Sequence, residues 1–435
     1  MSMRFWNLSE SNVRTIVDWH IHSKYSRACS KQLELPVISE WCARKGIDIV
    51  ATGDWTHPAW FAHIKEHLVE DTQGIYTCRG GSAPRPATRF MLVQEVSQIY
   101  KKGDRTRRIH NLVFSPSIET CEKVIAELEK RNVNLKADGR PIFGMDSEDL
   151  YKLLKEIDEK IIIIPAHAWT PWYAIFGSKS GFNSIEECYG EEMSKYIYAI
   201  ETGLSSDPFM NWGLSALDDV VLISNSDAHS PRNLGREANV FELDGAPTYD
   251  EFVRILKEKD ASKFKYTIEF HPEEGKYHFD GCASCEVVCS PEESKKYGFK
   301  CTSCQKKLTL GVHHRVGELS DRDPESVRSR KIPYKSIVPL AEIIAECYGV
   351  KSVQSKKVLE EYMRLTGEVA NEFTLLLDTP IEEITKAATN PNVSEAIQRV
   401  REGKLEIKPG YDGVYGRVSI FGEDGPQKPI QSTLI

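Results

Sequence analysis

The chain has 435 residues, of which 40% are hydrophobic and 28% are charged, a composition that is ordinary for a folded globular protein. The net charge of −8 argues against a general affinity of the whole chain for nucleic acids. The longest apolar block, residues 161–166, is far shorter than the roughly 20 residues that a membrane span needs, so we expect no membrane segment. The first residues lack the apolar core of a secretion signal, and we therefore expect a cytoplasmic location.

Short β-rich apolar segments alternate with helical patterns through residues 1–260. The strand-like segments are TIVDWHIH, DIVATGDW, RFMLVQEV, RIHNLVF, IIIIPAHAW, YIYAIETG and VVLISNSDAH. Between them, segments such as IETCEKVIAELEKRN and EDLYKLLKEIDEK have apolar residues three and four positions apart, which is typical of helices. Strands that alternate with helices predict parallel pairing and right-handed crossovers, and about seven such units indicate a barrel-like α/β domain.

Histidines and carboxylates lie at or just beyond the carboxyl ends of these apolar segments. They are His20, His22, Asp54, His57, Glu95, His110, His167, Asp227 and His229. In an α/β barrel these ends meet on one rim, where catalytic groups gather. Imidazole and carboxylate ligands suit ions such as zinc, manganese or iron, and closely spaced ions activate water and hold a phosphoryl centre. We therefore expect a rim site for two or three divalent ions (Zn, Mn, Mg or Fe) that hydrolyses a phosphoester.

This ordered set of motifs resembles the polymerase and histidinol phosphatase (PHP) superfamily over about residues 14–260. The resemblance implies a distorted seven-stranded (β/α) barrel that holds two or three metals. One motif departs from the family pattern, because the segment GDWTH at residues 53–57 stands where members often carry Asp-His. Whether Asp54, His57 or both reach a metal is therefore open.

Two C-x-x-C pairs predict a separate zinc-binding module in residues 261–331. The pairs are separated by fifteen residues and consist of Cys282, Cys285, Cys301 and Cys304. This spacing matches a zinc ribbon or knuckle, in which four thiolates complete the tetrahedron and leave no open position, so the zinc is expected to be structural. Cys289 could replace one of the four, and His271 and His278 are weaker ligand candidates.

The zinc module is locally basic. From Lys295 to Lys331 the chain has ten Lys and Arg against four Asp and Glu, which fits either a solvated face or a contact with a polyanion. If the partner is DNA, the residues expected to follow its backbone are Arg105, Arg107, Arg108, Lys306, Lys307 and Arg315.

Residues 332–425 predict a helical domain that ends in a hairpin. Several short segments between about residues 335 and 405 have apolar residues at helical spacing and clear Pro, Gly and Asn stops. Such a bundle could grip a nucleic-acid backbone or be purely structural. The segment KPGYDGVYGRVSIFGE predicts the hairpin. In the tail, residues 426–435, Gln431 and Leu434 resemble the start of a sliding-clamp-binding motif, although the aromatic pair that usually follows is absent.

The combination of these parts resembles the endonuclease Q family over nearly the whole chain. The segments TGDWTHP, PAHAWTPW, ETGLSSDP and SNSDAHSP precede a four-cysteine module and a helical domain. The resemblance implies a DNA-repair endonuclease, nucleoid-associated in the cytoplasm, that nicks DNA on the 5′ side of deaminated bases (uracil, hypoxanthine and xanthine) and at abasic sites. Enzymes that inspect one base usually flip it out of the stack into a pocket.

The segment that follows His167 is the candidate for this pocket. Its aromatic and hydrogen-bonding side chains are Trp169, Trp172, Tyr173, Phe176, Ser178, Lys179 and Ser180. Donors aimed at the carbonyl oxygen that deamination creates would reject cytosine and adenine. The aromatic residues could equally pack in the core. Near the sixth apolar segment, Asp207 and Glu201 are candidates for proton transfer or for holding a ligand.

Two other functions fit parts of the sequence. A PHP phosphatase that acts on a small phosphomonoester needs neither the zinc module nor the basic segment. A binding scaffold whose metals are structural needs no hydrolysis.

Overall fold

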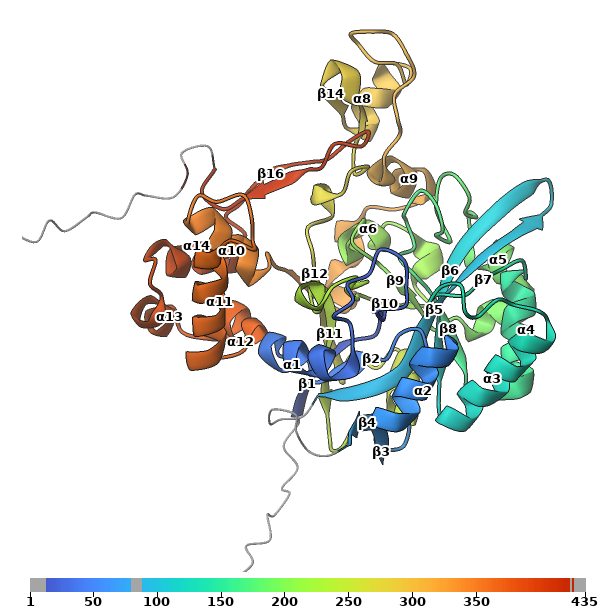
Figure 1. Ribbon diagram of the computed structural model, residues 1–435. Coiled ribbons are helices and arrows are strands. Elements are labelled where there is room, and N and C mark those ends of the chain that lie inside the picture. The colour runs from blue at the N-terminus through green and yellow to red at the C-terminus, as the bar shows by residue number, and fades with distance from the viewer. Residues whose placement is uncertain (1–12, 80–87, 423–424, 426–435) are drawn as a thin grey trace, which may run out of the picture.

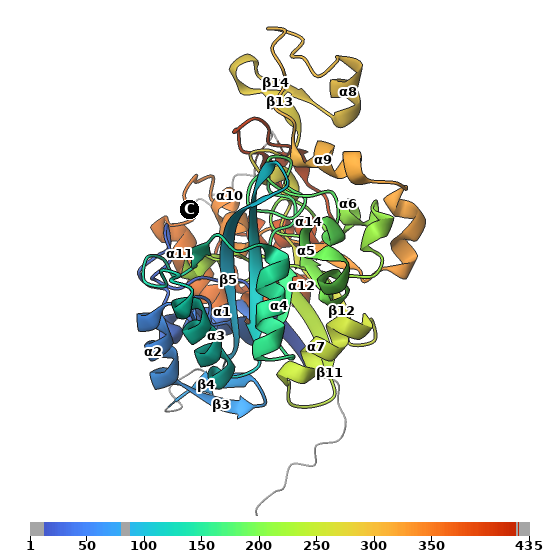
Figure 2. The ribbon, with the colours of Figure 1, turned by 90° about the vertical axis from the view of Figure 1, so that its right-hand side faces the viewer.

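The computed structural model describes residues 13–79, 88–422 and 425. Figures 1 and 2 show a large sheet with helices around it, a group of C-terminal helices against one side of the sheet, and a small module that projects from the body. The fold is therefore mixed α/β. Among the helices of the described residues, none is long and apolar enough to cross a membrane.

The strands fall into one large sheet and three pairs, β9–β10, β13–β14 and β16–β17. Their bounds are β1 (Val13–Asp18), β2 (Ile49–Ala51), β3 (Leu68–Thr72), β4 (Ile75–Cys78), β5 (Arg89–Lys102), β6 (Arg105–Ser115), β7 (Ile142–Phe143), β8 (Ile162–Pro165), β9 (Ala199–Glu201), β10 (Val221–Ile223), β11 (Ala238–Leu243), β12 (Phe264–Glu269), β13 (Asp280–Cys282), β14 (Val287–Cys289), β15 (Tyr334–Ser336), β16 (Glu406–Lys408) and β17 (Arg417–Ser419).

The α-helices lie between and after these strands. Their bounds are α1 (Leu35–Lys45), α2 (Pro58–His67), α3 (Ile118–Lys130), α4 (Ser147–Ile157), α5 (Ile185–Met193), α6 (Pro208–Trp212), α7 (Tyr249–Glu258), α8 (Pro291–Lys296), α9 (Val312–Leu319), α10 (Leu340–Cys347), α11 (Lys356–Glu368), α12 (Glu372–Leu377), α13 (Ile381–Ala387) and α14 (Asn392–Arg401).

The strand-like segments of the sequence correspond to β1, β2, β5, β6, β8, β9 and β10, but their pairing is not uniformly parallel. β1 pairs in parallel with β2, and β2 with β5. β5 and β6 form a long antiparallel hairpin, and β6 pairs antiparallel with β8. The expectation of parallel pairing throughout is therefore wrong. The chain reverses directly after β5 because Gly103, at φ 65°, adopts the left-handed conformation that a tight turn needs.

Backbone hydrogen bonds bring the β9–β10 pair between β8 and β1. Just after β8, the Ala168 N–H donates to the Glu201 carbonyl in β9 over 2.9 Å. Beyond the end of β1, Ile21 forms a parallel bridge with Ala228, and the His22 N–H donates to the Ala228 carbonyl over 3.2 Å. The segments that carry the predicted ligands thus meet at one end of the sheet.

The amphipathic segments of the first half form helices with ordinary caps. α3 begins after Ser117, whose side chain accepts from the Thr120 N–H, and it buries Val124 and Leu128. α4 begins after Asp146, which caps it in the same way. Both predicted helices are confirmed.

The C-terminal helices α10 to α14 are also those expected from the sequence, and β16 and β17 form the expected hairpin. A buried ion pair joins this group of helices to α1: Lys45 Nζ lies 2.7 Å from Glu372 Oε2. The same oxygen accepts a hydrogen bond from the Tyr362 hydroxyl over 2.7 Å. The helical group is therefore fixed against α1 by a satisfied polar contact.

The small projecting module contains β13, β14 and α8 (Figure 1). α8 begins with a capping box in which Ser290 and Glu293 each accept from the other's backbone N–H. The loop of the C-terminal hairpin reaches this module, because the Phe279 N–H donates to the Gly410 carbonyl over 2.9 Å. In addition, Asp412 Oδ2 accepts from the Ala283 N–H over 2.7 Å.

Candidate active site

Three overlapping groups of side chains could each hold a metal ion. Within each group the potential ligand atoms lie within 4.8 Å of one another. The groups are His20, His22 and Glu95; His22, Asp227 and His229; and Glu95, His110 and His167. Because the groups share His22 and Glu95, they form one continuous cluster. The structure thus brings together seven of the nine predicted ligands, although their role as ligands stays a prediction.

Glu95 lies at the centre of the cluster, completely buried in the middle of β5. Its Oε1 lies 2.5 Å from His110 Nδ1 and 2.9 Å from His167 Nε2. Its Oε2 lies 3.5 Å from His22 Nε2. Burial would raise the pKa of Glu95, but the contacts with His110, the charged Arg140 and His167 lower it well below its usual range, so the carboxyl group is ionised. A carboxylate between two groups of imidazoles is placed as a bridging ligand would be.

Among the histidines of the cluster, His110 is buried and His229 is partly exposed. Burial lowers the pKa of His110 to about 4, so this imidazole is neutral near pH 7, the form that binds metals. His229 Nδ1 donates to the Asp227 carbonyl over 2.8 Å, which leaves its Nε2 available. The side chains of Asp227 and His229 are 28% and 32% exposed, so they form the open edge of the cluster.

Glu201 holds His20 from behind. Both carboxylate oxygens lie 3.0 Å from His20 Nδ1, and they also accept from the His167 N–H and from Asn225 Nδ2. His20 Nε2 then faces Asp227 Oδ1 at 3.5 Å and Glu95 Oε1 at 3.7 Å. This buried nitrogen has no hydrogen-bond partner among the described residues, as expected of a metal ligand. Carboxylates that orient metal-binding histidines in this way are common.

Asp54 has the same position behind His22. Its Oδ1 lies 3.3 Å from His22 Nδ1. Its Oδ2 accepts from the Ser23 N–H at 2.7 Å, the Ser23 hydroxyl at 2.6 Å and the Ser26 hydroxyl at 2.9 Å. Both oxygens have hydrogen-bond partners, so in this structure Asp54 orients His22, and its role as a metal ligand stays a prediction.

His57 is also outside the cluster. It is the N-cap residue of α2, and its ring stacks on that of Tyr25 with the centroids 4.3 Å apart. It belongs to none of the candidate metal groups found among the described residues. The GDWTH segment thus places Asp54 behind His22 and His57 at the start of α2, and which of the two reaches a metal stays a prediction.

Three residues of this region have strained backbone. Asp54, His167 and Asp227 have φ values of 42°, 29° and 46°, in the left-handed region that residues other than glycine seldom adopt. Strain of this kind persists where the surrounding structure dictates it, and it gathers at functional sites. The three residues lie in the loops that follow β2, β8 and β10, where the chain turns close to the cluster.

Asp207 lies apart from the cluster. It is the N-cap of α6, and its Oδ1 accepts from the Met210 N–H over 2.8 Å. Burial raises the pKa of Asp207 to about 6. Asp207 is in none of the metal groups found in the described part of the chain, so the structure shows a capping role, and proton transfer by Asp207 stays a prediction. Of the two catalytic candidates, Glu201 contacts the cluster and Asp207 does not.

The expected base pocket divides into core and surface residues. Trp169 and Phe176 are 1% exposed, their ring centroids lie 4.9 Å apart, and Trp169 Nε1 donates to Asn211 Oδ1. The buried hydroxyl of Ser180 donates to the Arg108 carbonyl over 3.3 Å. These three side chains pack in the core, which is the alternative that the sequence left open for this segment. The reason is that the segment after β8 folds back on itself and covers its own apolar side chains.

Trp172 and Tyr173 differ from these core residues. Trp172 is 48% exposed and lies under the Arg108 guanidinium, which is 4.9 Å from its ring centroid. The ring of Tyr173 lies 4.6 Å from that of His110, at the edge of the cluster. Ser178 and Lys179 are exposed on the same segment. The structure therefore leaves an aromatic surface beside the candidate metal groups.

The residues expected to follow the DNA backbone are also of two kinds. Arg105, Lys306 and Lys307 are exposed. Arg315 instead donates to the carbonyls of Phe176 and Phe182, both over 3.1 Å, and so holds the segment after β8 in place. The guanidinium of Arg107 lies 4.0 Å from the ring centroid of Phe182 and bonds a carbonyl of the same segment, and Arg108 covers Trp172.

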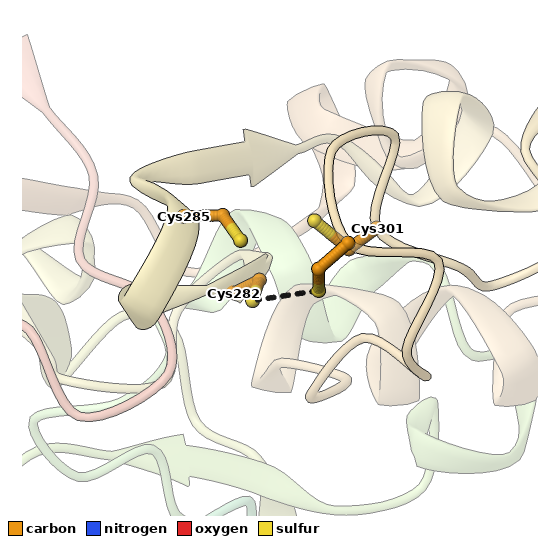
Figure 3. Close-up of side chains that lie close together, drawn as sticks. Cys282, Cys285 and Cys301 are labelled. Atoms are coloured by element: carbon orange, nitrogen blue, oxygen red, sulfur yellow. Dashed lines mark hydrogen bonds between the residues drawn. The ribbon is translucent and has the colours of Figure 1, made fainter.

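The four cysteines of the projecting module converge as expected. Figure 3 shows the side chains of Cys282, Cys285 and Cys301 facing one small space. The Sγ atoms of Cys282 and Cys304 lie 3.9 Å apart. Backbone N–H groups of Cys304 and Ser303 lower the pKa of the Cys301 thiol to about 7, which favours the thiolate that a metal needs. Cys289, His271 and His278 are not part of this group.

Arg140 is a site residue that the sequence did not reveal. Its Nη1 lies 2.6 Å from Glu95 Oε2, and its side chain is 22% exposed. Asn225, which bonds Glu201, was likewise not singled out. Arg140 lies in an irregular loop and follows no periodic pattern. Asn225 contacts Glu201, which itself only orients a candidate ligand, so ligand spacing gave no signal for it.

A solved structure resembles this chain over almost its entire length. It is the crystal structure of the lesion-specific endonuclease PfuEndoQ from Pyrococcus furiosus, which is 31% identical, covers 94% of this chain and 97% of that chain, and has a TM-score of 0.80. The chain belongs to the endonuclease Q family. A structure of Endonuclease Q in complex with a 27-mer duplex substrate, with an abasic lesion at the active site, is 30% identical and covers 97% of this chain and 100% of that one, also with a TM-score of 0.80. The resemblance drawn from the sequence motifs is thereby confirmed, as is the enzyme class, because endonuclease Q is a metal-dependent DNA endonuclease and hence a hydrolase.

Other relatives of this endonuclease Q family member carry no named activity. The uncharacterized protein MJ0043 of Methanocaldococcus jannaschii is 34% identical over 324 residues, which make up 68% of this chain and 39% of that relative. The chain therefore spans well under half of the length of MJ0043. The uncharacterized protein YqxK of Bacillus subtilis is 29% identical over 385 residues, 88% of this chain and 91% of that relative. The family model described as the MJ0043 C-terminal domain matches residues 339–404, the region of α10 to α14.

Proposed function

We propose that this protein is a metal-dependent endonuclease that hydrolyses the phosphodiester bond 5′ of deaminated bases (uracil, hypoxanthine and xanthine) and at abasic sites, in DNA repair. One observation carries the proposal: seven histidines and carboxylates converge in three overlapping groups on a chain similar throughout to endonuclease Q. The relative bound to duplex DNA with an abasic lesion supports the substrate class.

In this proposal the seven residues of the cluster, with Glu95 at its centre, would hold two or three divalent ions. The bound ions would supply activated water and neutralise charge on the phosphate. His20 and His22 keep their Nε2 atoms directed into the cluster because Glu201 and Asp54 bind their Nδ1 atoms. His229 and Asp227, at the open edge, are the ligands that the scissile phosphate would approach first.

For recognition of the lesion, we infer that the damaged nucleotide is flipped out of the duplex and stacks on the exposed aromatic surface formed by Trp172 and Tyr173. Base stacking on such side chains contributes about 1–3 kcal/mol per base. The nearby exposed donors of Ser178 and Lys179 are suited to the carbonyl oxygen that deamination creates. The buried Trp169 and Phe176 pack against each other in the core and do not form part of this surface.

Several wider expectations belong to the same proposal. The strands β1, β2, β5, β6, β8, β9 and β10 would represent the distorted seven-stranded PHP barrel, and the four-cysteine group would hold one structural zinc. Exposed lysines of the zinc module would follow the DNA backbone. The sliding-clamp motif lies in residues 426–435, outside the described residues, and stays a prediction. A cytoplasmic, nucleoid-associated location follows from a duplex DNA substrate.

A denaturing-gel assay tests the proposal. Labelled duplexes with a single uracil, hypoxanthine, xanthine, abasic site or normal base are incubated with the protein and with manganese or magnesium. We expect one nick on the 5′ side of each lesion and none in the normal duplex, and we expect the variant His20→Ala/His22→Ala to lose nicking while it keeps its circular dichroism spectrum. Nicking that is independent of the lesion would contradict the proposed specificity. Release of phosphate from small monoesters, with no nicking, would favour the PHP phosphatase.

A further inference from the structure

Arg140 places a permanent positive charge inside the candidate active site. Its Nη1 contacts Glu95 Oε2 at 2.6 Å, on the carboxylate oxygen other than the one that faces His110 and His167. Burial would lower the pKa of Arg140, but the carboxylates of Glu95, Asp227 and Asp138 raise it. The guanidinium is therefore charged at any pH at which the protein is folded.

The backbone on both sides of Arg140 is fixed. The Gly139 N–H donates to the Tyr25 carbonyl over 3.1 Å, and the Pro141 carbonyl accepts from the Ser97 N–H over 2.9 Å. A Cβ atom on Gly139 would lie 2.2 Å from Asp54 Oδ2, so only glycine lets this loop press against the residues behind the cluster. The loop thus delivers the arginine to the centre at a defined position.

Pairing with Glu95 does not use the whole guanidinium. Arginine carries five N–H donors in a planar fork that matches the paired oxygens of a phosphate. Arg140 Nε is buried and has no hydrogen-bond partner among the described residues. A cation cannot itself bind a metal, and it competes with metal ions for Glu95. Its position is therefore explained better by an anionic ligand that arrives from the open edge, near Asp227, than by the metals.

We propose that Arg140 is a further catalytic residue, which binds the non-bridging oxygens of the scissile phosphate and stabilises the negative charge that develops on them. The inference rests on the proposed function, because it names the group of the substrate that the arginine contacts. A fixed donor aimed at developing charge is among the most effective forms of catalysis. The competing role is that of a positioning residue that only orients Glu95.

Metal content separates these two roles. The variants Arg140→Ala and Arg140→Lys are compared with the native protein after equilibration with manganese and gel filtration. If Arg140 binds phosphate, the manganese bound per chain is unchanged, and it can rise in Arg140→Ala because a competing cation is gone. A loss of bound manganese would overturn the proposal in favour of a positioning role. Arg254→Lys in α7, whose guanidinium pairs with Glu251, Glu258 and Asp260, is the matched control.

Binding to DNA gives the second readout. Duplexes that contain one abasic site carry either an ordinary phosphate or a neutral methylphosphonate at the scissile position, and affinity is measured in calcium. We expect the native protein and Arg254→Lys to prefer the ordinary phosphate by about tenfold or more, Arg140→Ala to lose most of this preference, and Arg140→Lys to keep part of it. An undiminished preference in Arg140→Ala, or no preference in the native protein, would overturn the inference.

These measurements do not depend on turnover, so they separate the two proposals. A native protein that discriminates between the two duplexes but nicks neither would contradict the proposed function and leave the arginine contact intact. A native protein that nicks, with Arg140→Ala unchanged in both affinity and nicking, would contradict only the arginine contact. Thermal unfolding of each variant identifies any that fails to fold, and Arg140→Lys then provides the comparison.

Discussion

Two carboxylates that hold histidine rings from behind set the geometry of the candidate site at the scale of single residues. Glu201 and Asp54 bind the Nδ1 atoms of His20 and His22, so that both Nε2 atoms point to the same space. Neither carboxylate lies among the converging atoms. Their contribution is to fix the tautomer and the ring orientation before any ligand arrives, which reduces the entropy lost on binding.

Glu201→Gln tests this role. On either side the amide NH₂ of glutamine would face His20 Nδ1 and a second donor, the His167 N–H or Asn225 Nδ2, so the ring of His20 would lose its fixed orientation. We expect metal affinity or nicking to fall by about 10-fold to 100-fold. Metal titration and the gel assay measure both quantities. Glu122→Gln, at an exposed carboxylate paired with Lys65, should change neither. An unchanged metal affinity in Glu201→Gln would show that His20 is oriented by other contacts.

Asp207 is a second residue whose role can be measured. Its folded-state pKa is raised from 3.8 to about 6 by burial, so the folded protein binds this proton more tightly than the unfolded chain does. The free energy of unfolding therefore falls as the pH rises from about 4 through 6, and the penalty is complete above that range. Asp207→Asn keeps an oxygen for the Met210 N–H and carries no charge.

We expect Asp207→Asn to be more stable than the native protein at pH 8, by up to about 3 kcal/mol, and to gain about half as much at pH 5. Urea unfolding at the two pH values measures the difference. Asp146→Asn, at the partly exposed N-cap of α4, is the matched control. Because Asp207 lies away from the cluster, nicking should persist in Asp207→Asn. If Asp207→Asn lowered the nicking rate by two orders of magnitude, Asp207 would instead take part in proton transfer.

At the scale of elements, the long hairpin of β5 and β6 decides which residues meet. Glu95 and His110 lie inside these strands rather than at their ends, and the antiparallel pairing brings the two side chains together. The sequence indicated that both residues belong to one cluster, but the argument assumed that they lie at the ends of parallel strands that meet on one rim. Alternation of apolar residues does not distinguish a hairpin from two strands joined by a crossover, because the turn at Gly103 occupies so few residues.

The loop before β7 is the other element on which the site depends. Gly139→Ala would place a Cβ atom 2.2 Å from Asp54 Oδ2 and 2.5 Å from Ser26 Oγ, so the loop must move and Arg140 must move with it. We expect nicking to fall by at least about tenfold, as small displacements of positioned groups often cause. Gly245→Ala, where a Cβ atom would meet nothing within 4 Å, should retain activity. Equal activity of the two variants would show that the loop tolerates displacement.

At the scale of the whole molecule, charge is distributed unevenly. The net charge is −8, yet the segment from Lys295 to Lys331 has an excess of positive charge, and Lys306 and Lys307 are exposed on the projecting module. If they contact phosphates, log affinity for duplex should fall with log salt by about 0.9 for each contact. Lys306→Ala/Lys307→Ala should reduce that slope by about 1.8, measured by fluorescence anisotropy between low and physiological salt. Lys356→Ala, exposed in the helical group, is the comparison. A slope that the double variant leaves unchanged would place the module away from DNA.

The sequence was sufficient for the parts whose signals are local. The helices α3, α4 and α10 to α14, the C-terminal hairpin and the four-cysteine group followed from periodicity, caps and cysteine spacing. Strand direction, the roles of Asp54 and Asp207, and the burial of Trp169 depend on contacts between distant residues, for which single-chain patterns carry no signal. Arg140 belongs to this second class. The domain limits at residues 260 and 331 stay predictions.

The C-terminal hairpin connects the helical group to the four-cysteine module. Its strands β16 and β17 rise from the helical group, but its loop is bonded to the cysteine-bearing turn through Asp412 and Gly410. The four-cysteine module is therefore held in place by its own chain connections and also by a hairpin loop that is more than a hundred residues away in the sequence. Thermal unfolding of the helical group would therefore release these contacts, so the rigidity of the four-cysteine module depends on helices that are distant from it in the sequence.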